Sequence, residues 1–224
     1  MANDVISLKN PKSVVAEAFR TLRTNIQFSS LDNELKTIVV TSTQPSEGKS
    51  TVLVNLAVTM AQSGKKVVLL DCDLRKPTIH RKLGVPNKNG LTTLLSKEKS
   101  LQECLQLLGV PNLYIITSGP IPPNPAELLG SKRMKGLLQE LKEHFDVILI
   151  DAPPVLAVTD SQILSTLTDG VLFVTAYGTT EKEAVVRAKE LIEKVGGKIL
   201  GVVMNKMPAD TKGSYTGYYY YSYE

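Results

Sequence analysis

Short apolar runs that alternate with stretches of helical periodicity constrain the fold of this chain more than any other feature. Each run is bounded like a buried strand, and the stretches between the runs repeat apolar residues at helical spacing. Continuous apolar strands separated by helices imply a mostly parallel sheet that is covered on both faces. We therefore predict a doubly wound α/β fold. The predicted strands are Thr37–Thr41, Lys66–Leu70, Leu113–Thr117, Val147–Ile150, Val171–Thr175 and Ile199–Met204.

Helices are predicted before and between these strands. Ser13 can cap a helix that runs to about Phe28, because Ser is a favoured helix N-cap. The segment 91–110 is expected to hold short helices rather than a strand. The apolar stripe of the first helix is predicted to consist of Val15, Phe19, Leu22 and Ile26. The later predicted helices are Lys49–Gln62, Ser131–His144, Asp160–Thr166 and Glu181–Val195.

The length of 224 residues fits one medium α/β domain, or a domain with a short extension. No apolar run approaches the roughly 20 residues of a membrane span, and the N-terminus lacks a secretory pattern. Cys72 and Cys104 make no disulfide framework, so we expect a cytoplasmic protein. The net charge of +4 is mild and Lys and Arg are spread along the chain, so no nucleic-acid partner is expected.

A phosphate-binding loop follows the first predicted strand. Gly48, Lys49 and Ser50 are the last three defining residues of a Walker A motif. Glycine lets the backbone approach phosphate oxygens, and amides at the start of the next helix point at the anion. Lys49 would reach the β- and γ-phosphates, and the Ser50 hydroxyl would ligate Mg²⁺. Thr43 departs from the motif, because the first glycine normally stands there. The loop comprises Thr43, Gln44, Pro45, Ser46, Glu47, Gly48, Lys49, Ser50 and Thr51.

Three acidic residues follow two other predicted strands. Asp71 and Asp73 follow the second strand, and Asp151 follows the fourth. Two carboxylates one residue apart repel each other unless a cation lies between them, and Mg²⁺ prefers such oxygen ligands. Alternatively, the first pair is a polar strand end with an Arg75 ion pair, and Asp151 is a turn acid. Because all three acids occur together with the loop, the sequence predicts a site for ATP and Mg²⁺.

The C-terminal segment is unlike a core segment. Six of the eight tyrosines lie in the last ten residues, and Ala209 is the one aliphatic residue after Met207. Tyrosine rings without apolar neighbours cannot form a packed core, so residues 208–224 are predicted to be a flexible tail. The tail tyrosines are Tyr215, Tyr218, Tyr219, Tyr220, Tyr221 and Tyr223.

Taken together, these motifs resemble those of the bacterial tyrosine kinases of capsule and exopolysaccharide synthesis. The resemblance covers nearly the whole chain and rests on the phosphate loop, the Asp71/Asp73/Arg75 box, the Asp151 box and the tyrosine tail. It implies a P-loop NTPase fold related to the partition and division-site ATPases. It also implies a helical extension over residues 1–35, a kinase domain over 36–207 and a phosphoacceptor tail over 208–224.

The resemblance implies roles for individual residues. Thr51 would lie near the α-phosphate, and Asp73 and Asp151 would hold metal-bound water. Asp71 would either accept the tyrosine proton or contact Mg²⁺, and the sequence leaves both open. Asn205, which ends the last predicted strand, would contact the adenine edge as in related ATPases. Its alternative role is that of a turn former.

The resemblance also implies self-assembly. Glu17, Arg20 and Arg23 match a family motif, E-x-x-R-x-x-R, that is used for ring-like assembly. The alternative is an ordinary solvated helix face. Besides itself, the expected partners are a separate transmembrane activator of the polysaccharide co-polymerase type, a tyrosine phosphatase and other tyrosine-bearing proteins. The protein would act in the cytoplasm at the inner face of the membrane, and would autophosphorylate its tail in trans.

Two other functions stay open at this point. A partition or division-site ATPase would hydrolyse ATP as a dimer switch without making a phosphoprotein. Those relatives carry a signature lysine where this chain has Gln44, and they lack a tyrosine-dense tail. A non-catalytic assembly module would bind nucleotide only to stabilise a ring. Radiolabelled ATP separates the three, because the label appears in protein, in free phosphate, or in neither.

Overall fold

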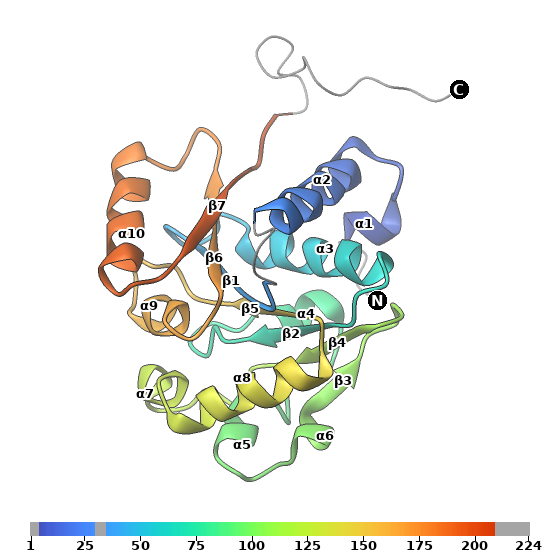
Figure 1. Cartoon of the computed structure of the whole chain (residues 1–224), viewed down its shortest axis with the longest axis vertical. Coiled ribbons are helices and arrows are strands. Elements are labelled where there is room, and N and C mark those ends of the chain that lie inside the picture. Colours follow the sequence, from blue (N-terminus) through green and yellow to red (C-terminus); the bar gives the residue numbers. More distant parts are fainter. Residues whose placement is uncertain (1–4, 30–34, 209–224) are drawn as a thin grey trace.

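Seven strands form one central sheet in the computed structural model, which describes residues 5–29 and 35–208 (Figure 1). They are β1 (Thr37–Ser42), β2 (Val67–Asp71), β3 (Leu105–Leu107), β4 (Leu113–Ile116), β5 (Val147–Asp151), β6 (Gly170–Ala176) and β7 (Ile199–Asn205). Their order in the sheet is β3-β4-β2-β5-β1-β6-β7. All neighbouring strands are parallel except β3, which runs antiparallel to β4. The predicted mostly parallel sheet is confirmed.

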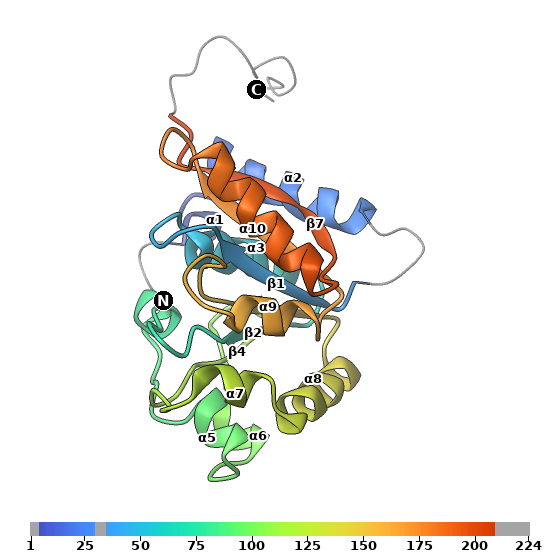
Figure 2. The same cartoon turned by 90° about the vertical axis from the view of Figure 1, so that its left-hand side faces the viewer.

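Helices cover both faces of the sheet (Figures 1 and 2). They are α1 (Ile6–Lys9), α2 (Val14–Phe28), α3 (Lys49–Gln62), α4 (Ile79–Leu83), α5 (Leu91–Leu95), α6 (Leu101–Cys104), α7 (Pro125–Leu129), α8 (Lys132–His144), α9 (Asp160–Ser165) and α10 (Lys182–Lys194). α2 and α3 lie on one side, and α8, α9 and α10 on the other. The doubly wound fold is therefore confirmed.

Local sequence signals set the helix starts. The hydroxyl of Ser13 accepts a hydrogen bond from the Ala16 amide at 3.1 Å, and the hydroxyl of Ser131 accepts one from the Met134 amide at 3.2 Å. Such caps satisfy amides that have no partner inside the helix. Both helices were predicted with these starts, and α2 and α8 confirm them.

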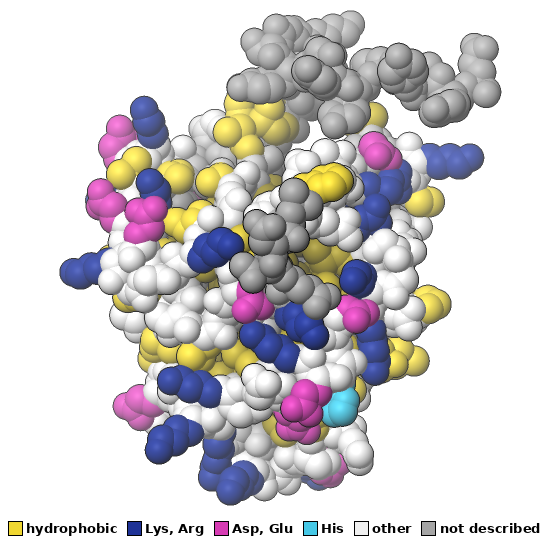
Figure 3. All heavy atoms as spheres, in the orientation of Figure 1, with side chains coloured by type: hydrophobic (Ala, Val, Ile, Leu, Met, Phe, Trp, Pro, Cys, Tyr) yellow, Lys and Arg dark blue, Asp and Glu magenta, His cyan; other side chains and the backbone are white. Residues whose placement is uncertain are grey.

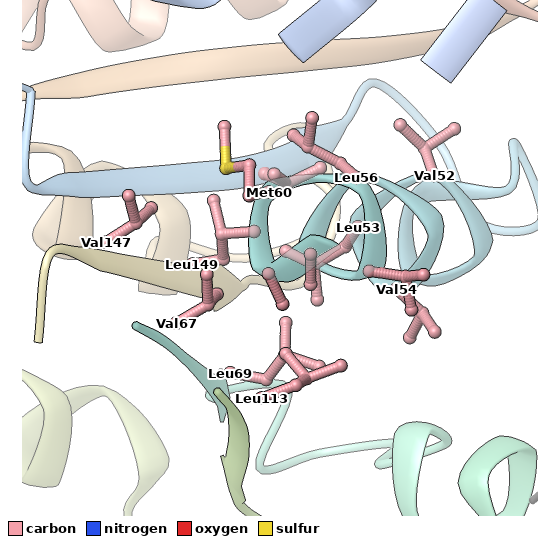
Figure 4. Packing of buried hydrophobic residues seen from close by; sticks show 14 of the residues in the cluster. Val52, Leu53, Val54, Leu56, Met60, Val67, Leu69, Leu113, Val147 and Leu149 are labelled. Carbon is pink, nitrogen blue, oxygen red and sulfur yellow. The ribbon is translucent and has the colours of Figure 1, made fainter. Parts of the chain in front are cut away.

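The core consists of two apolar layers, one on each face of the sheet. α3 is buried along most of its length, because the sheet covers one side and α2 the other. Figure 4 shows Leu53 and Met60 of α3 over Leu149 and Val67 of the sheet. Burying one such side chain contributes about 1.5–3 kcal/mol. The loop that precedes α3 is thus anchored on the most deeply buried helix of the fold.

Two expectations were wrong. Segment 91–110 contains a strand, β3, in addition to short helices. β3 has three residues and pairs on one edge only, so it has too little length to produce a recognisable period. Val15 is 53% exposed and does not belong to the buried stripe of α2. The buried face is centred on Ala16 and Ile26, with Phe19 and Leu22 partly buried.

The surface carries both signs of charge. Figure 3 shows Lys and Arg side chains interspersed with acidic and uncharged ones over several elements. Across residues 5–29 and 35–208, no helix combines the length and the apolar character needed to cross a bilayer. Both cysteines are buried and free.

Candidate active site

The phosphate loop connects the end of β1 to the first residue of α3. Gly48 caps α3 with a φ of +95°, which a residue with a side chain rarely adopts. A Cβ at this position would stand 2.1 Å from Nδ2 of Asn205, so the close approach of β7 also requires glycine. Ser46 has a φ of +67° although it carries a side chain. The loop is therefore held in a conformation that its sequence does not favour by itself.

Lys49 lies between two carboxylates at the carboxyl edge of the sheet. Its Nζ is 3.0 Å from Oδ2 of Asp73 and 3.0 Å from Oδ2 of Asp151. Burial opposes the charge on Lys49, but Asp151 and Asp73 outweigh that effect and raise the pKa of the ammonium group. Ser50 donates to the same Asp151 oxygen at 2.8 Å. The sequence thus correctly predicted that these four residues meet.

Asp71 is the least compensated charge of the site. It is fully buried, and neither of its carboxylate oxygens has a hydrogen-bond donor in the described part of the chain. Burial raises the pKa of Asp71 well above its ordinary value and the charge of Asp151 raises it further, while Lys49 and the Asp73 backbone amide oppose the rise. Burial also raises the pKa of Asp151, although Lys49 opposes the rise. Oδ1 of Asp151 likewise has no donor among the described residues.

Buried carboxylate oxygens without donors fit a divalent cation. Mg²⁺ in nucleotide sites is usually held by one or two carboxylates, water and the phosphates, rather than by a protein cage. No three acidic, His or Cys side chains converge as a metal cage within residues 5–29 and 35–208. Ser50, Asp73 and Asp151 are the residues that would hold the ion, directly or through water, and Asp71 would either contact it or accept the tyrosine proton.

An ion pair between exposed Arg75 and buried Asp160 supports the segment that follows β2. Arg75 donates from Nε and Nη2 to the two oxygens of Asp160 at 2.9 and 3.0 Å, and Asp160 is fully buried at the start of α9. The alternative interpretation of Asp71 and Asp73 included an Arg75 ion pair, but its partner is Asp160. Asp160 was not singled out from the sequence, because an acid at the first residue of a helix resembles an ordinary cap.

Two other predicted nucleotide contacts have partners within the chain. Nδ2 of Asn205 donates to the carbonyl of Glu47 at 2.9 Å, so its amide nitrogen supports the loop backbone. Thr51 accepts a hydrogen bond from Nζ of Lys82 at 3.1 Å. Lys82, on α4, was not singled out from the sequence. Asn205 lies beside the loop, as its proposed role requires, and its contact with adenine remains a prediction.

The predicted assembly motif on α2 makes contacts inside the chain. Arg20 and Glu17 form an ion pair of 2.6 Å, and Arg20 also donates to the Pro11 carbonyl at 2.8 Å. Arg23 donates to the Thr59 carbonyl of α3 at 2.9 Å. Arg23 therefore joins two helices of the same chain instead of lying on a free ridge. The acceptor tyrosines of the tail lie outside the described residues.

The fold and the site define a P-loop nucleoside triphosphatase. Residues 35–199 match the family described as AAA domain. The fold is also similar to that of the septum site-determining protein MinD from Pyrococcus horikoshii, whose structure contains Mg-ADP. That similarity has a TM-score of 0.64 at 25% identity and covers 75% of this chain and 69% of MinD.

Bacterial tyrosine kinases are much more similar to this chain. The chain is 47% identical to the tyrosine-protein kinase YwqD of Bacillus subtilis over 219 residues, which is 98% of this chain and 92% of YwqD. The kinase domain of the Escherichia coli tyrosine kinase ETK matches with a TM-score of 0.89 at 32% identity, covering 98% of this chain and 84% of that domain. The chain belongs to the family of bacterial tyrosine-protein kinases. Its activity is therefore that of a protein-tyrosine kinase, and the family resemblance stated from the motifs is confirmed.

Proposed function

We propose that this kinase transfers the γ-phosphoryl group of ATP to its own tail tyrosines, in trans within a ring-like homo-oligomer. The observation that carries this proposal is the end of β7 against the phosphate loop. Asn205 donates to Glu47, and Nζ of Lys206 donates to the Ser46 carbonyl at 2.7 Å. The chain therefore leaves the last strand next to the phosphate loop. From Asn205 to Tyr215, an extended chain spans at most about 33–36 Å, which does not exclude transfer to the same chain. The family resemblance favours transfer in trans.

In this proposal, the loop and its neighbours hold the triphosphate. Loop amides and Lys49 bind the phosphates, and Ser50, Asp73 and Asp151 hold Mg²⁺ directly or through water. When bound, Mg²⁺ neutralises charge on the transferring phosphoryl group. Asp73 and Asp151 keep the Lys49 ammonium group charged and fix its position. Most of the rate enhancement then comes from positioning and charge stabilisation.

Asp71 is the residue we assign as general base. A free tyrosine phenol has a pKa near 10, so its attack is helped by a carboxylate that accepts the proton. A raised pKa makes the Asp71 carboxylate a better proton acceptor than an exposed one. The phenol oxygen forms the new bond to phosphorus, the bond to the β-phosphate oxygen breaks, and ADP leaves.

Transfer in trans has a direct test. One chain carries Lys49→Met with an intact tail, and the other is active but has its six tail tyrosines replaced by phenylalanine. Neither chain alone should become phosphorylated, whereas the mixture should label the Lys49→Met chain. Phosphotyrosine is measured on size-tagged chains by blotting and mass spectrometry. Transfer in trans would be contradicted by two results together: no phosphotyrosine on the Lys49→Met chain in the mixture, and a wild-type autophosphorylation rate per molecule that does not depend on protein concentration.

Phosphorylation is expected to loosen the assembly. Each phosphotyrosine adds roughly −1.5 to −2 charges, so six add roughly −9 to −12, against a net charge of +4 for the whole chain. Tails gathered in one ring would then repel one another. Light scattering should give a lower oligomer mass for the phosphorylated protein than for the same sample after phosphatase treatment. Equal masses would rule out this form of regulation.

The proposed setting follows the family resemblance. The kinase would work in the cytoplasm with a separate transmembrane activator of the co-polymerase type, which recruits it to the membrane. A tyrosine phosphatase would reverse the modification, and other tyrosine-bearing proteins would be further substrates. In this way the kinase would regulate capsule or exopolysaccharide synthesis and export.

A further inference from the structure

A buried carboxylate lies within the phosphate loop, although phosphate binding does not call for one. Glu47 is 5% exposed and has no ion pair with Lys, Arg or His among the described residues. A negative charge in an anion-binding loop opposes the binding of phosphate. Its presence therefore needs a reason that is independent of direct ligand contact.

Hydrogen bonds account for how this carboxylate is held. Oε1 of Glu47 accepts a hydrogen bond from the Thr43 hydroxyl at 2.6 Å, and Oε2 accepts one from the Gln44 amide at 2.9 Å. Oε1 also accepts a hydrogen bond from the hydroxyl of Thr180, in the loop between β6 and α10. The Thr180 oxygen itself accepts from the Ala176 amide at 2.8 Å, which leaves its proton for Glu47.

The loop needs such a constraint. Ser46 and Gly48, on either side of Glu47, both have left-handed backbone angles, with φ of +67° and +95°. A residue with a Cβ adopts this region only at a cost in free energy, so Ser46 would relax if the loop were free. The carboxylate joins the first residues of the loop, Thr43 and Gln44, to its last turn. This contact also gives a reason for threonine in place of the usual glycine at position 43, since glycine has no hydroxyl to donate.

We propose that the Thr180–Glu47–Thr43 bracket positions the amides of the phosphate loop for nucleotide phosphates. Glu47 and Thr180 are then positioning residues, because they act through the loop and do not contact the phosphates. In the bracket, the Gln44 backbone amide donates to Oε2 of Glu47. This inference rests on the proposed nucleotide site, and it does not depend on which tyrosines accept the phosphoryl group.

The test measures nucleotide binding directly. Calorimetry with Mg²⁺ gives the dissociation constant of ADP, which does not depend on phosphotyrosine formation. Glu47→Ala should raise this constant on the order of 10- to 100-fold, since hydrogen bonds to a charged group are lost. Thr180→Val keeps the shape, removes only the hydroxyl and should raise the constant by about 3- to 10-fold. Glu183→Ala, an exposed acid on α10, is the matched control and should bind as wild type does.

Two further readouts distinguish positioning from a general structural role. Glu47→Gln should bind ADP within a few-fold of wild type. The side-chain oxygen of the new glutamine can accept from the Gln44 backbone amide, while its NH2 group donates to a threonine hydroxyl oxygen. The double variant Glu47→Ala with Thr180→Val should bind no worse than Glu47→Ala alone, since both changes break one bracket. In kinase assays, KM for ATP should rise while kcat at saturating ATP stays nearly constant.

Several results would overturn the proposal. If both Glu47→Ala and Thr180→Val bind ADP with wild-type affinity, the bracket does not shape the loop. If the losses in ADP binding free energy add up in the double variant, the two side chains act separately. If Glu47→Ala does not fold, Thr180→Val carries the test alone, with unchanged affinity as the contrary outcome. If the wild-type protein binds ADP but does not phosphorylate its tail, that result counts against the proposed kinase reaction at the tail, whereas the bracket is judged by the ADP affinities of the variants alone.

Discussion

Replacing Lys49 with methionine is expected to lower the rate of tyrosine phosphorylation by about 10²–10³-fold or more. This is the effect expected when an enzyme loses one preorganised group that stabilises charge in the transition state. The Lys49 ammonium is held at 3.0 Å by Asp73 and at 3.0 Å by Asp151, so its position is fixed before ATP binds. Methionine fills similar space without a charge. Transfer of label from γ-labelled ATP to protein is the measurement.

The same substitution should reduce stability. Removing one partner of a buried ion pair leaves uncompensated charge and costs about 3–5 kcal/mol, in part relieved when a carboxyl group takes up a proton. Unfolding in urea should therefore show a folded variant with a lower midpoint. Lys189→Met, at an exposed pair with Glu193 on α10, is the control and should change neither activity nor stability by much. A Lys49→Met protein that still phosphorylates tyrosine would exclude the proposed site.

The fold was predictable because its sheet is buried on both faces. β1, β5 and β6 are uniformly buried, so their sequences are continuous apolar runs, with bounds within one residue of those predicted. α3 was predicted with its observed bounds for the same reason. β3 lies at the sheet edge and is only partly buried, so its three residues carry no such signal. Val15 was misplaced because periodicity alone does not fix how a helix is rotated about its axis.

The site was predictable where it depends on topology. β2, β5 and β1 are neighbours and parallel, so acids that end two of them must lie beside the loop that ends the third. The side-chain contacts that hold the site residues in place were not predictable from topology. Arg75 and Asp160 are 85 residues apart, and Thr180 and Glu47 are 133 apart. No local pattern relates such residues, and each is a common loop or helix-start residue.

Replacing Asp71 with asparagine is expected to make the protein more stable and much less active. The substitution keeps the size of the side chain but removes a fully buried charge that has no donor among the described residues. Relief of an uncompensated buried group should raise the free energy of unfolding by about 1–3 kcal/mol in the absence of nucleotide. Loss of a general base should lower phosphotransfer by about 10²–10⁴-fold. Urea unfolding and the label-transfer assay measure the two effects.

The pH dependence gives this prediction its sharpest form. Burial, and then the charge of Asp151, raise the pKa of Asp71 well above its ordinary value, so the folded state binds the proton more tightly than the unfolded state does. The free energy of unfolding of wild type should therefore fall as pH rises from the unfolded pKa, about 4, towards the raised folded pKa. An asparagine side chain cannot titrate, so the advantage of the Asp71→Asn variant should widen over that interval and level off above it. Two results would contradict this prediction: an Asp71→Asn variant less stable than wild type at neutral pH, or a stability advantage that shrinks as pH rises. Either result would show that burial does not destabilise the charged form of Asp71, and the assignment of Asp71 as general base would lose its support.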